Sequence, residues 1–224
     1  MHLHLSSSRK SHGPLVFGLH KEQWEAMAAP TQFMRDSSSH EFCALTLTEA
    51  IVHATHNLKS PIVQVCLGKV SAFDSALKEH IIREVFTAAN NTPSQSILYL
   101  AYCLASRKTY LKSQQTVMGP ICDARGVKQG GIASSKLFQL ITDGKLKTLN
   151  STRLWIPIGE VNLAALSQAD DQVLLSTSTT RAQALVDIAV DLASQNNLRN
   201  VPTKTKIIIT NPKLSTNPKF NMIS

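Results

Sequence analysis

Two adjacent aspartates, Asp170 and Asp171, lie between two short apolar segments, and this feature constrains the fold more than any other. The apolar segments 161–166 and 173–175 predict strands, so Gln168-Ala169-Asp170-Asp171 predicts the tip of a β-hairpin. Adjacent carboxylates repel each other and are costly beside a buried sheet unless a cation or hydrogen-bond donors compensate them. Carboxylates also hold Mg²⁺, and paired ions stabilise the attacking and leaving oxygens of phosphoryl transfer. The tip is therefore a candidate metal site, although Asp is also common in solvated turns.

The segments around this hairpin predict an α+β fold. Residues 62–67 form a nearly continuous apolar run, typical of a strand buried on both faces. Apolar positions at helical spacing predict helices, and β-branched runs predict further strands. The expected helices cover about 42–57, 75–89, 93–104, 134–149 and 181–195, and the further strands cover 109–117 and 206–210. This order fits a small antiparallel sheet with helices packed on one face.

Length and cysteine usage narrow the class of protein. A chain of 224 residues with 43% hydrophobic content suits one globular domain. Its four cysteines form no CxxC pair, which favours a reducing compartment over a disulfide framework. The sequence contains neither a signal-peptide pattern nor an apolar run long enough to span a membrane. We therefore expect an intracellular protein, nuclear or cytoplasmic and not secreted, with no membrane partner.

Charge is distributed unevenly. The formal net charge is +8, and residues 91–224 carry the whole excess, with 15 Lys or Arg against 7 Asp or Glu. Such a basic part favours a polyanionic partner such as nucleic acid or an acidic membrane surface.

Five short segments, taken in order, resemble a known family. Together they resemble the palm of reverse transcriptases of the non-long-terminal-repeat retrotransposon type, over residues 31–210. The segments are Thr31-Gln32-Phe33 through Ser39-His40-Glu41, Leu67 through Ser71-Ala72-Phe73-Asp74-Ser75, Gly126-Val127-Lys128-Gln129-Gly130-Gly131, Gln168-Ala169-Asp170-Asp171 and Lys204-Thr205-Lys206. Met118-Gly119-Pro120-Ile121 and Gln168 are similar to one animal transposon subgroup with a Gln-Ala-Asp-Asp motif. Residues 1–30 and 211–224 are then an irregular extension and an irregular tail around a partial palm.

The resemblance implies a role for each matched residue. Asp170 and Asp171 match the acids that bind catalytic Mg²⁺ or Mn²⁺, and Lys204 matches a lysine near the triphosphate that donates a proton to the leaving pyrophosphate. Phe73 matches the aromatic that packs under the incoming sugar, while Gln129 and Gly130 match the loop that positions nucleotide and template. The implied activity is RNA-directed DNA polymerisation, with deoxynucleoside triphosphates, an RNA template and primer DNA or an RNA/DNA hybrid as partners. Taken singly, Phe73 also suits a core position, Gln129 a turn and Lys204 a solvated charge.

One position departs from the family pattern. The family has a third metal-binding aspartate six residues before the position of Asp74, where this chain has Gly68, and no acid occurs between Ile51 and Phe73. Without the shared ligand, two-metal chemistry should be badly impaired. The chain also has little sequence for the fingers and thumb that flank a palm, and apolar surface left uncovered could cause self-association.

Three readings follow. The chain is a reverse-transcriptase-like palm with impaired catalysis, a non-catalytic nucleic-acid-binding module, or an inert transposon remnant. Salt-dependent binding to RNA would favour the second reading over the third.

Overall fold

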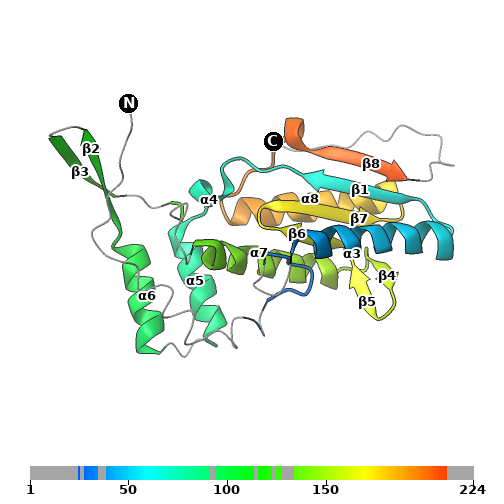
Figure 1. Ribbon diagram of the computed structural model, residues 1–224, viewed down its shortest axis with the longest axis horizontal. Helices are drawn as coiled ribbons and strands as arrows, with labels where there is room; N and C mark the ends of the chain where they lie inside the picture. The colour runs from blue at the N-terminus through cyan, green and yellow to red at the C-terminus, as the bar shows by residue number, and fades with distance from the viewer. Residues whose placement is uncertain are drawn as a thin grey trace. The chain divides into compact units, whose positions relative to one another are not determined.

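The computed structural model describes residues 25, 28–34, 39–90, 94–113, 116–122, 125–127 and 134–210. The chain divides into two compact units (Figure 1). The first comprises Met1–Met27 and Phe73–Leu140, and the second comprises Ala28–Ala72 and Ile141–Ser224. The division falls within one long helix, α7 (Ser134–Ser151).

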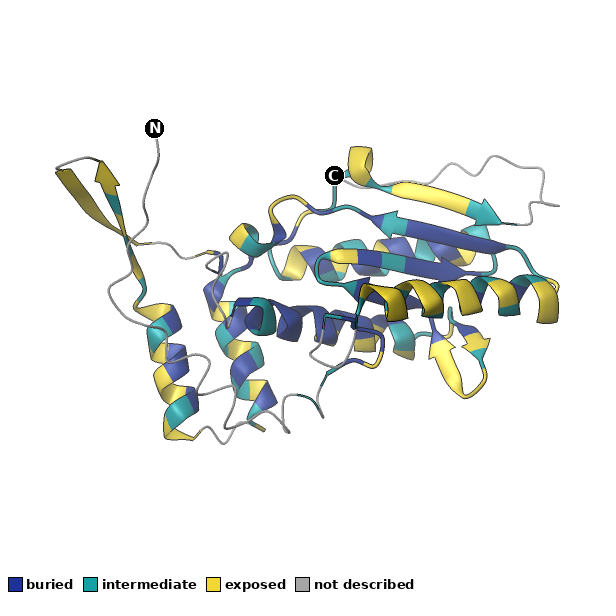
Figure 2. Cartoon of the chain, in the orientation of Figure 1, coloured by how far each residue is buried: buried dark blue, intermediate teal, exposed yellow. Residues whose placement is uncertain are grey.

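The second unit is built on a four-stranded antiparallel sheet in the order β6-β7-β1-β8. Its central strand β1 (Ile62–Leu67) pairs with β7 (Asp171–Ser176) on one side and with β8 (Lys206–Thr210) on the other. β6 (Ala165–Gln168) pairs with β7 through a tight hairpin. Figure 2 shows β1 almost wholly buried, whereas the edge strand β8 is mostly exposed. The bounds of β1 and β8 match the predicted strands residue for residue.

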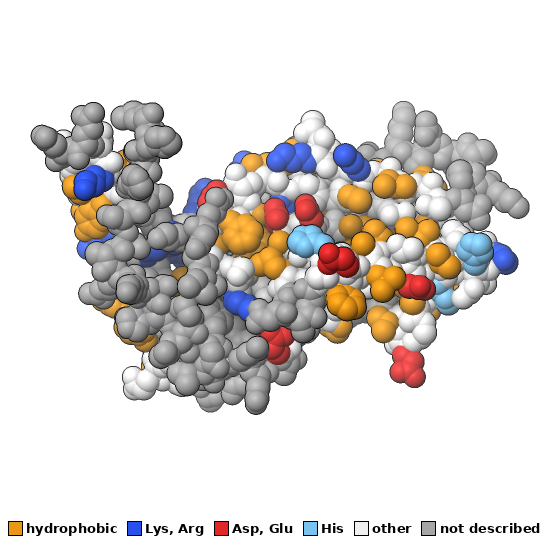
Figure 3. Space-filling model, in the orientation of Figure 1, with side chains coloured by type: hydrophobic (Ala, Val, Ile, Leu, Met, Phe, Trp, Pro, Cys, Tyr) orange, Lys and Arg blue, Asp and Glu red, His pale blue; other side chains and the backbone are white. Residues whose placement is uncertain are grey.

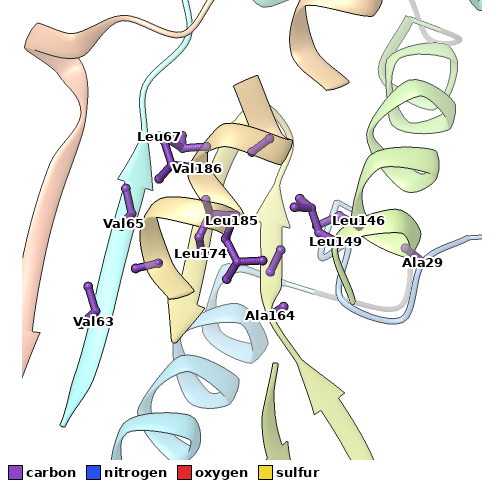
Figure 4. Close-up of a cluster of buried hydrophobic side chains, with 13 residues drawn as sticks. Ala29, Val63, Val65, Leu67, Leu146, Leu149, Ala164, Leu174, Leu185 and Val186 are labelled. Carbon is purple, nitrogen blue, oxygen red and sulfur yellow. The ribbon is translucent and has the colours of Figure 1, made fainter. Parts of the chain in front are cut away.

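One face of the sheet packs against two helices (Figure 4). Leucine and valine side chains from β1 and β7 contact α8 (Thr179–Gln195) and the second half of α7. The residues labelled in the figure are Val63, Val65, Leu67, Leu174, Leu185, Val186, Leu146, Leu149, Ala29 and Ala164. Burying this much apolar surface is the main source of stability for the unit.

The other face is covered by α3 (His40–Val52) and its continuation η1 (His53–Asn57). Ile62, Leu166 and Leu175 alternate with the residues of the first face and pack with Ala50 and Ala54 of this helical segment. The predicted α+β class with a small antiparallel sheet is confirmed. The structure adds a helix on the second face, because the apolar side chains that three strands place there need cover.

The predicted strand 161–166 is wrong as a single element. It divides at Ala164 into β5 (Val161–Leu163), which pairs with β4 (Ile156–Ile158), and β6. The side chain of Asn150 on α7 holds the division, since its Oδ1 accepts hydrogen bonds from the backbone nitrogens of Ala164 and Ala165 at 2.7 and 2.9 Å. Its Nδ2 donates to the Ala165 carbonyl and to Thr31 Oγ1.

The first unit contains mainly helices. α5 (Lys78–Ala88) packs against α6 (Gln95–Ala105), and Ile81, Val85 and Ala88 form the buried side of α5. The predicted strand 109–117 is correct in type but wrong as a single element, because the segment and its continuation form a hairpin of β2 (Lys108–Ser113) and β3 (Thr116–Cys122). Figure 2 shows this hairpin largely exposed.

Some predictions concern residues that the structure does not describe. Of the expected extension 1–30, only residues 25 and 28–30 are described, and the tail 211–224, Gln129 and Gly130 lie outside the described residues. Within the described ranges, no helix has both the length and the apolar character needed to cross a membrane.

Candidate functional site

The β6–β7 turn presents the two adjacent aspartates. Gln168 pairs with Asp171, so Ala169 and Asp170 form a two-residue turn. Ala169 has a φ of 56°, the positive value that tight hairpin turns require at this point. The buried hydroxyl of Ser167 lies 3.0 Å from the Ala169 carbonyl oxygen and 2.9 Å from that of Asp171. The turn is therefore held from inside, with Asp170 half-buried and Asp171 exposed.

Gly68 directly follows β1 and lies close to this turn. Leu67 faces Gln172 across the sheet, so the register continues from Gly68 toward Asp171. The carbonyl oxygen of Gly68 accepts a hydrogen bond from Val201 N at 2.8 Å. A Cβ added at Gly68 would collide with the Cβ of Lys204 and lie 2.9 Å from the Lys204 carbonyl oxygen. Gly68 therefore permits a close approach of η2 (Pro202–Lys204) to the end of β1.

Lys69 points its ammonium group at the same turn. Its Nζ donates a hydrogen bond to the backbone carbonyl oxygen of Asp170 at 2.5 Å. The residue is only 7% exposed, and its backbone forms an antiparallel bridge with Asn200. The pKa of Lys69 is lowered to about 8 by burial, which outweighs the favourable charges of Asp170 and Asp171.

A second buried lysine, Lys145, lies on the inner side of α7. Among the described residues its Nζ has no hydrogen-bond partner. Burial lowers its pKa to about 7, and the positive charge of Lys69 lowers it further. Two buried ammonium groups thus lie among the described residues of the second unit, and Lys69 is the one that contacts the acidic turn.

The acids of the site do not fit a two-ion centre. In the part of the chain that the structure describes, no group of three or more His, Cys, Asp or Glu side chains could hold a metal ion. Asp170 and Asp171 lie together, but Gly68 supplies no carboxylate. Burial raises the pKa of the nearby Cys66 thiol, with Lys206 opposing the shift and Asp171 adding to it, so this thiol is a poor substitute ligand.

The predicted nucleotide-binding residues belong to the first unit or lie outside the description. Phe73, in α4 (Ala72–Ser75), stacks on Phe138 with ring centroids 4.4 Å apart. The start of the predicted glycine loop is tied to this helix, since Val127 N donates to the Phe73 carbonyl oxygen at 2.9 Å. Gly126 has a φ of 79°, and an added Cβ would lie 3.1 Å from Asp74 Cα, so this position requires glycine.

Comparison with known proteins decides the family. The model of the family described as reverse transcriptase (RNA-dependent DNA polymerase) matches residues 21–220. The chain belongs to the reverse transcriptase family. This match confirms the prediction of a reverse transcriptase. No curated protein sequence matches the chain.

Solved structures share the reverse transcriptase fold at low sequence identity. Telomerase from Candida tropicalis, in complex with a fragment of telomeric RNA, is 12% identical with a TM-score of 0.67, covering 88% of this chain and 34% of that chain. Apo telomerase from the same organism, truncated from its C-terminal domain, is 9% identical with a TM-score of 0.63, covering 94% and 43%. Telomerase from Candida albicans, also with a telomeric RNA fragment, is 11% identical with a TM-score of 0.56, covering 93% and 34%. The chain therefore spans between about one third and 43% of the length of these chains.

The structure brings together four residues that the sequence singled out: Gly68, Asp170, Asp171 and Lys204. Sequence reasoning missed Lys69 and Lys145. Lys145 carried a signal, because it lies four residues from both Ile141 and Leu149 on an apolar helix side. Lys69 carried none beyond its place after Gly68, since a lysine after a strand is usually solvated.

Proposed function

We propose that the chain is the palm region of a retrotransposon reverse transcriptase that has little or no polymerase activity. The carrying observation is the end of β1, where Gly68 supplies no carboxylate beside Asp170 and Asp171. In this proposal the palm covers residues 31–210, and Met118 to Ile121 with Gln168 mark the animal non-long-terminal-repeat subgroup.

The site residues have inherited but incomplete roles. Asp170 and Asp171 are the remaining metal-binding acids, and Lys204 is the inherited proton donor to pyrophosphate. Phe73, Gln129 and Gly130 are the inherited nucleotide and template contacts. Two carboxylates without a shared third ligand do not fit a pair of Mg²⁺ or Mn²⁺ ions, so template-directed transfer from deoxynucleoside triphosphates is impaired.

The contacts around Gly68 support the proposed loss of the metal-binding aspartate. Any side chain at this position must displace the backbone of Lys204, which lies within 3 Å of the added Cβ. The η2 segment therefore occupies the space that an aspartate side chain at this position would need. The substitution Gly68→Asp would therefore strain the contact between position 68 and Lys204.

Metal-dependent primer extension tests the proposal, with Mg²⁺ and Mn²⁺ compared on a primed RNA template. The unaltered chain and Gly68→Asp are assayed beside Gly68→Ala, which adds the Cβ without the carboxylate. We expect extension by the unaltered chain to equal the reaction without protein. Metal-dependent extension by the unaltered chain that exceeds the reaction without protein, and is as fast as that by Gly68→Asp, would overturn the impairment.

A retained nucleic-acid-binding role is the second candidate, favoured by the basic excess of residues 91–224. Its partners would be an RNA template, primer DNA or an RNA/DNA hybrid, in the nucleus or cytoplasm. The candidate predicts hybrid binding whose affinity falls as salt is raised. Absence of binding at low salt, with cooperative unfolding lost as well, would instead favour an inert remnant.

Self-association is part of the same proposal. Phe42, Leu45 and Val52 of α3 are exposed, and Figure 3 shows hydrophobic side chains gathered on the face where α3 lies. Exposed apolar surface of this kind favours association. Light scattering over a range of concentrations should show oligomers, and a monomer at every concentration would contradict this part.

A further inference from the structure

Lys69 is placed by backbone contacts on both sides. Val201 N donates to the Gly68 carbonyl oxygen at 2.8 Å, and Val70 N donates to the Arg199 carbonyl oxygen at 3.2 Å. Lys69 itself bridges to Asn200 between these two bonds. The direction in which its side chain leaves the backbone is therefore fixed by a short antiparallel pairing.

This placement buries the lysine against the acidic turn. Its side chain is more than nine-tenths buried, and its ammonium nitrogen lies 2.5 Å from the Asp170 carbonyl oxygen. The charges of Asp170 and Asp171 both act on it. A buried ammonium group needs such compensation, because burial of an unpaired charge is strongly unfavourable.

We infer that the Lys69 ammonium group is the resident cation of the Asp170–Asp171 turn and keeps divalent ions from binding there. The inference deepens the proposed loss of catalysis and rests on the proposal that these two aspartates are the remaining metal-binding acids. Lys69 supplies a positive charge from within the protein, and its ammonium group donates a hydrogen bond to the Asp170 carbonyl oxygen. A divalent ion beside the two carboxylates would be repelled by this fixed charge in a partly buried place, where screening is weak.

Direct Mn²⁺ binding to the full chain tests the inference without any assay of activity. Free Mn²⁺ is measured by electron paramagnetic resonance in titrations of the unaltered chain, Lys69→Met and Lys69→Gln. Gln keeps a donor for the Asp170 carbonyl but removes the charge, so it separates the hydrogen bond from the electrostatics. Lys147→Met, which removes an exposed lysine from α7 in the same unit, is the matched control.

Both Lys69 variants should bind Mn²⁺ at least about ten-fold more tightly than the unaltered chain and Lys147→Met. The gain should disappear when Asp170→Asn and Asp171→Asn are added. Equal affinity of folded Lys69→Gln and the unaltered chain would overturn the inference while leaving the proposed loss of polymerase activity intact. Polymerase activity of the unaltered chain, together with unchanged Mn²⁺ affinity of the Lys69 variants, would overturn both the inference and the proposed loss of activity.

A measurement on the unaltered chain keeps the inference testable if the variants do not fold. Asp187 and Asp191 form an exposed acid pair one turn apart on α8 and serve as an internal reference. Mn²⁺ should broaden the backbone amide signals of residues 187–191 at lower concentration than those of residues 168–172. Broadening at the turn before the reference pair would overturn the inference.

Discussion

Two regions of the second unit each bury a lysine, and they differ in what surrounds the charge. At the end of β1, Lys69 has the Asp170 carbonyl oxygen and two carboxylate charges. On the inner side of α7, Lys145 has no hydrogen-bond partner among the described residues, and Lys69 repels it. The difference indicates that the acidic turn compensates the charge of Lys69, whereas the buried charge of Lys145 mainly lowers the stability of the folded chain.

Replacing Lys145 should have the largest effect. Lys145→Met removes a charge whose pKa is about 7 in the folded chain, and the free energy of unfolding at pH 6 should rise by roughly 3 kcal/mol. Because the folded pKa lies below the ordinary lysine value of 10.5, the unfolded chain binds more protons between these values. Stability of the unaltered chain should therefore increase from pH 7 upward, and the variant should lose part of that increase.

Denaturant unfolding at several pH values between 6 and 9 measures this change. Lys147→Met, at an exposed position on the same helix, is the control and should behave like the unaltered chain. A Lys145→Met chain less stable than the control at pH 6 would show that the ammonium group is compensated after all.

A methyl group at Gly68 should have the next largest effect. Gly68→Ala presses on the Lys204 backbone and should lower the free energy of unfolding by about 2 kcal/mol. Gly144→Ala is the matched control, because its added Cβ meets nothing within 4 Å and alanine favours the helix by about 1 kcal/mol. The two alanines should therefore shift the unfolding midpoint in opposite directions, and equal shifts would remove the steric argument.

Replacing Lys69 tests the comparison itself. Lys69→Met relieves the burial of a charge, but it leaves the Asp170 carbonyl oxygen without its donor and removes the positive charge that Asp170 and Asp171 favour. Its free energy of unfolding at pH 6 should therefore be about 1–2 kcal/mol below that of Lys145→Met. Equal stability of the two variants would mean that the acidic turn does not stabilise the buried charge of Lys69.

The smallest effect is expected at Ala169 in the turn. Ala169→Gly relieves a positive φ and should raise the free energy of unfolding by about 0.5–1 kcal/mol. Gly159, with a φ of 58° and nothing within 4 Å of an added Cβ, offers the reciprocal change. Gly159→Ala should lower stability by about 1 kcal/mol, and a destabilising Ala169→Gly would contradict the strain argument.

The sequence predicted the parts of the fold in which local pattern and burial agree. The apolar run of β1, the isoleucines of β8 and the helical spacing of α8 each determine their element. The segment 109–117 was predicted as one strand because no glycine or proline separates the end of β2 from the start of β3. The division at Ala164 depends on Asn150, a contact between residues 14 apart that no local pattern contains.

The sequence predicted the acidic residues of the candidate site but not its buried lysine. Asp170 and Asp171 follow from the hairpin, and the missing carboxylate at Gly68 follows from motif spacing. Burial of Lys69 depends on pairing with residues 199–201, about 130 positions along the chain. Contacts this distant arise from tertiary packing, so the electrostatic character of the site required the structure.

The most direct test of a reverse transcriptase palm without catalysis is the ratio of two primer-extension rates. The unaltered chain is compared with its Asp170→Asn/Asp171→Asn variant on a primed RNA template in Mn²⁺. Both rates should equal the rate without protein, because the two aspartates lack their third partner and face Lys69 instead. Extension by the unaltered chain that is lost when the two carboxylates become amides would contradict the account.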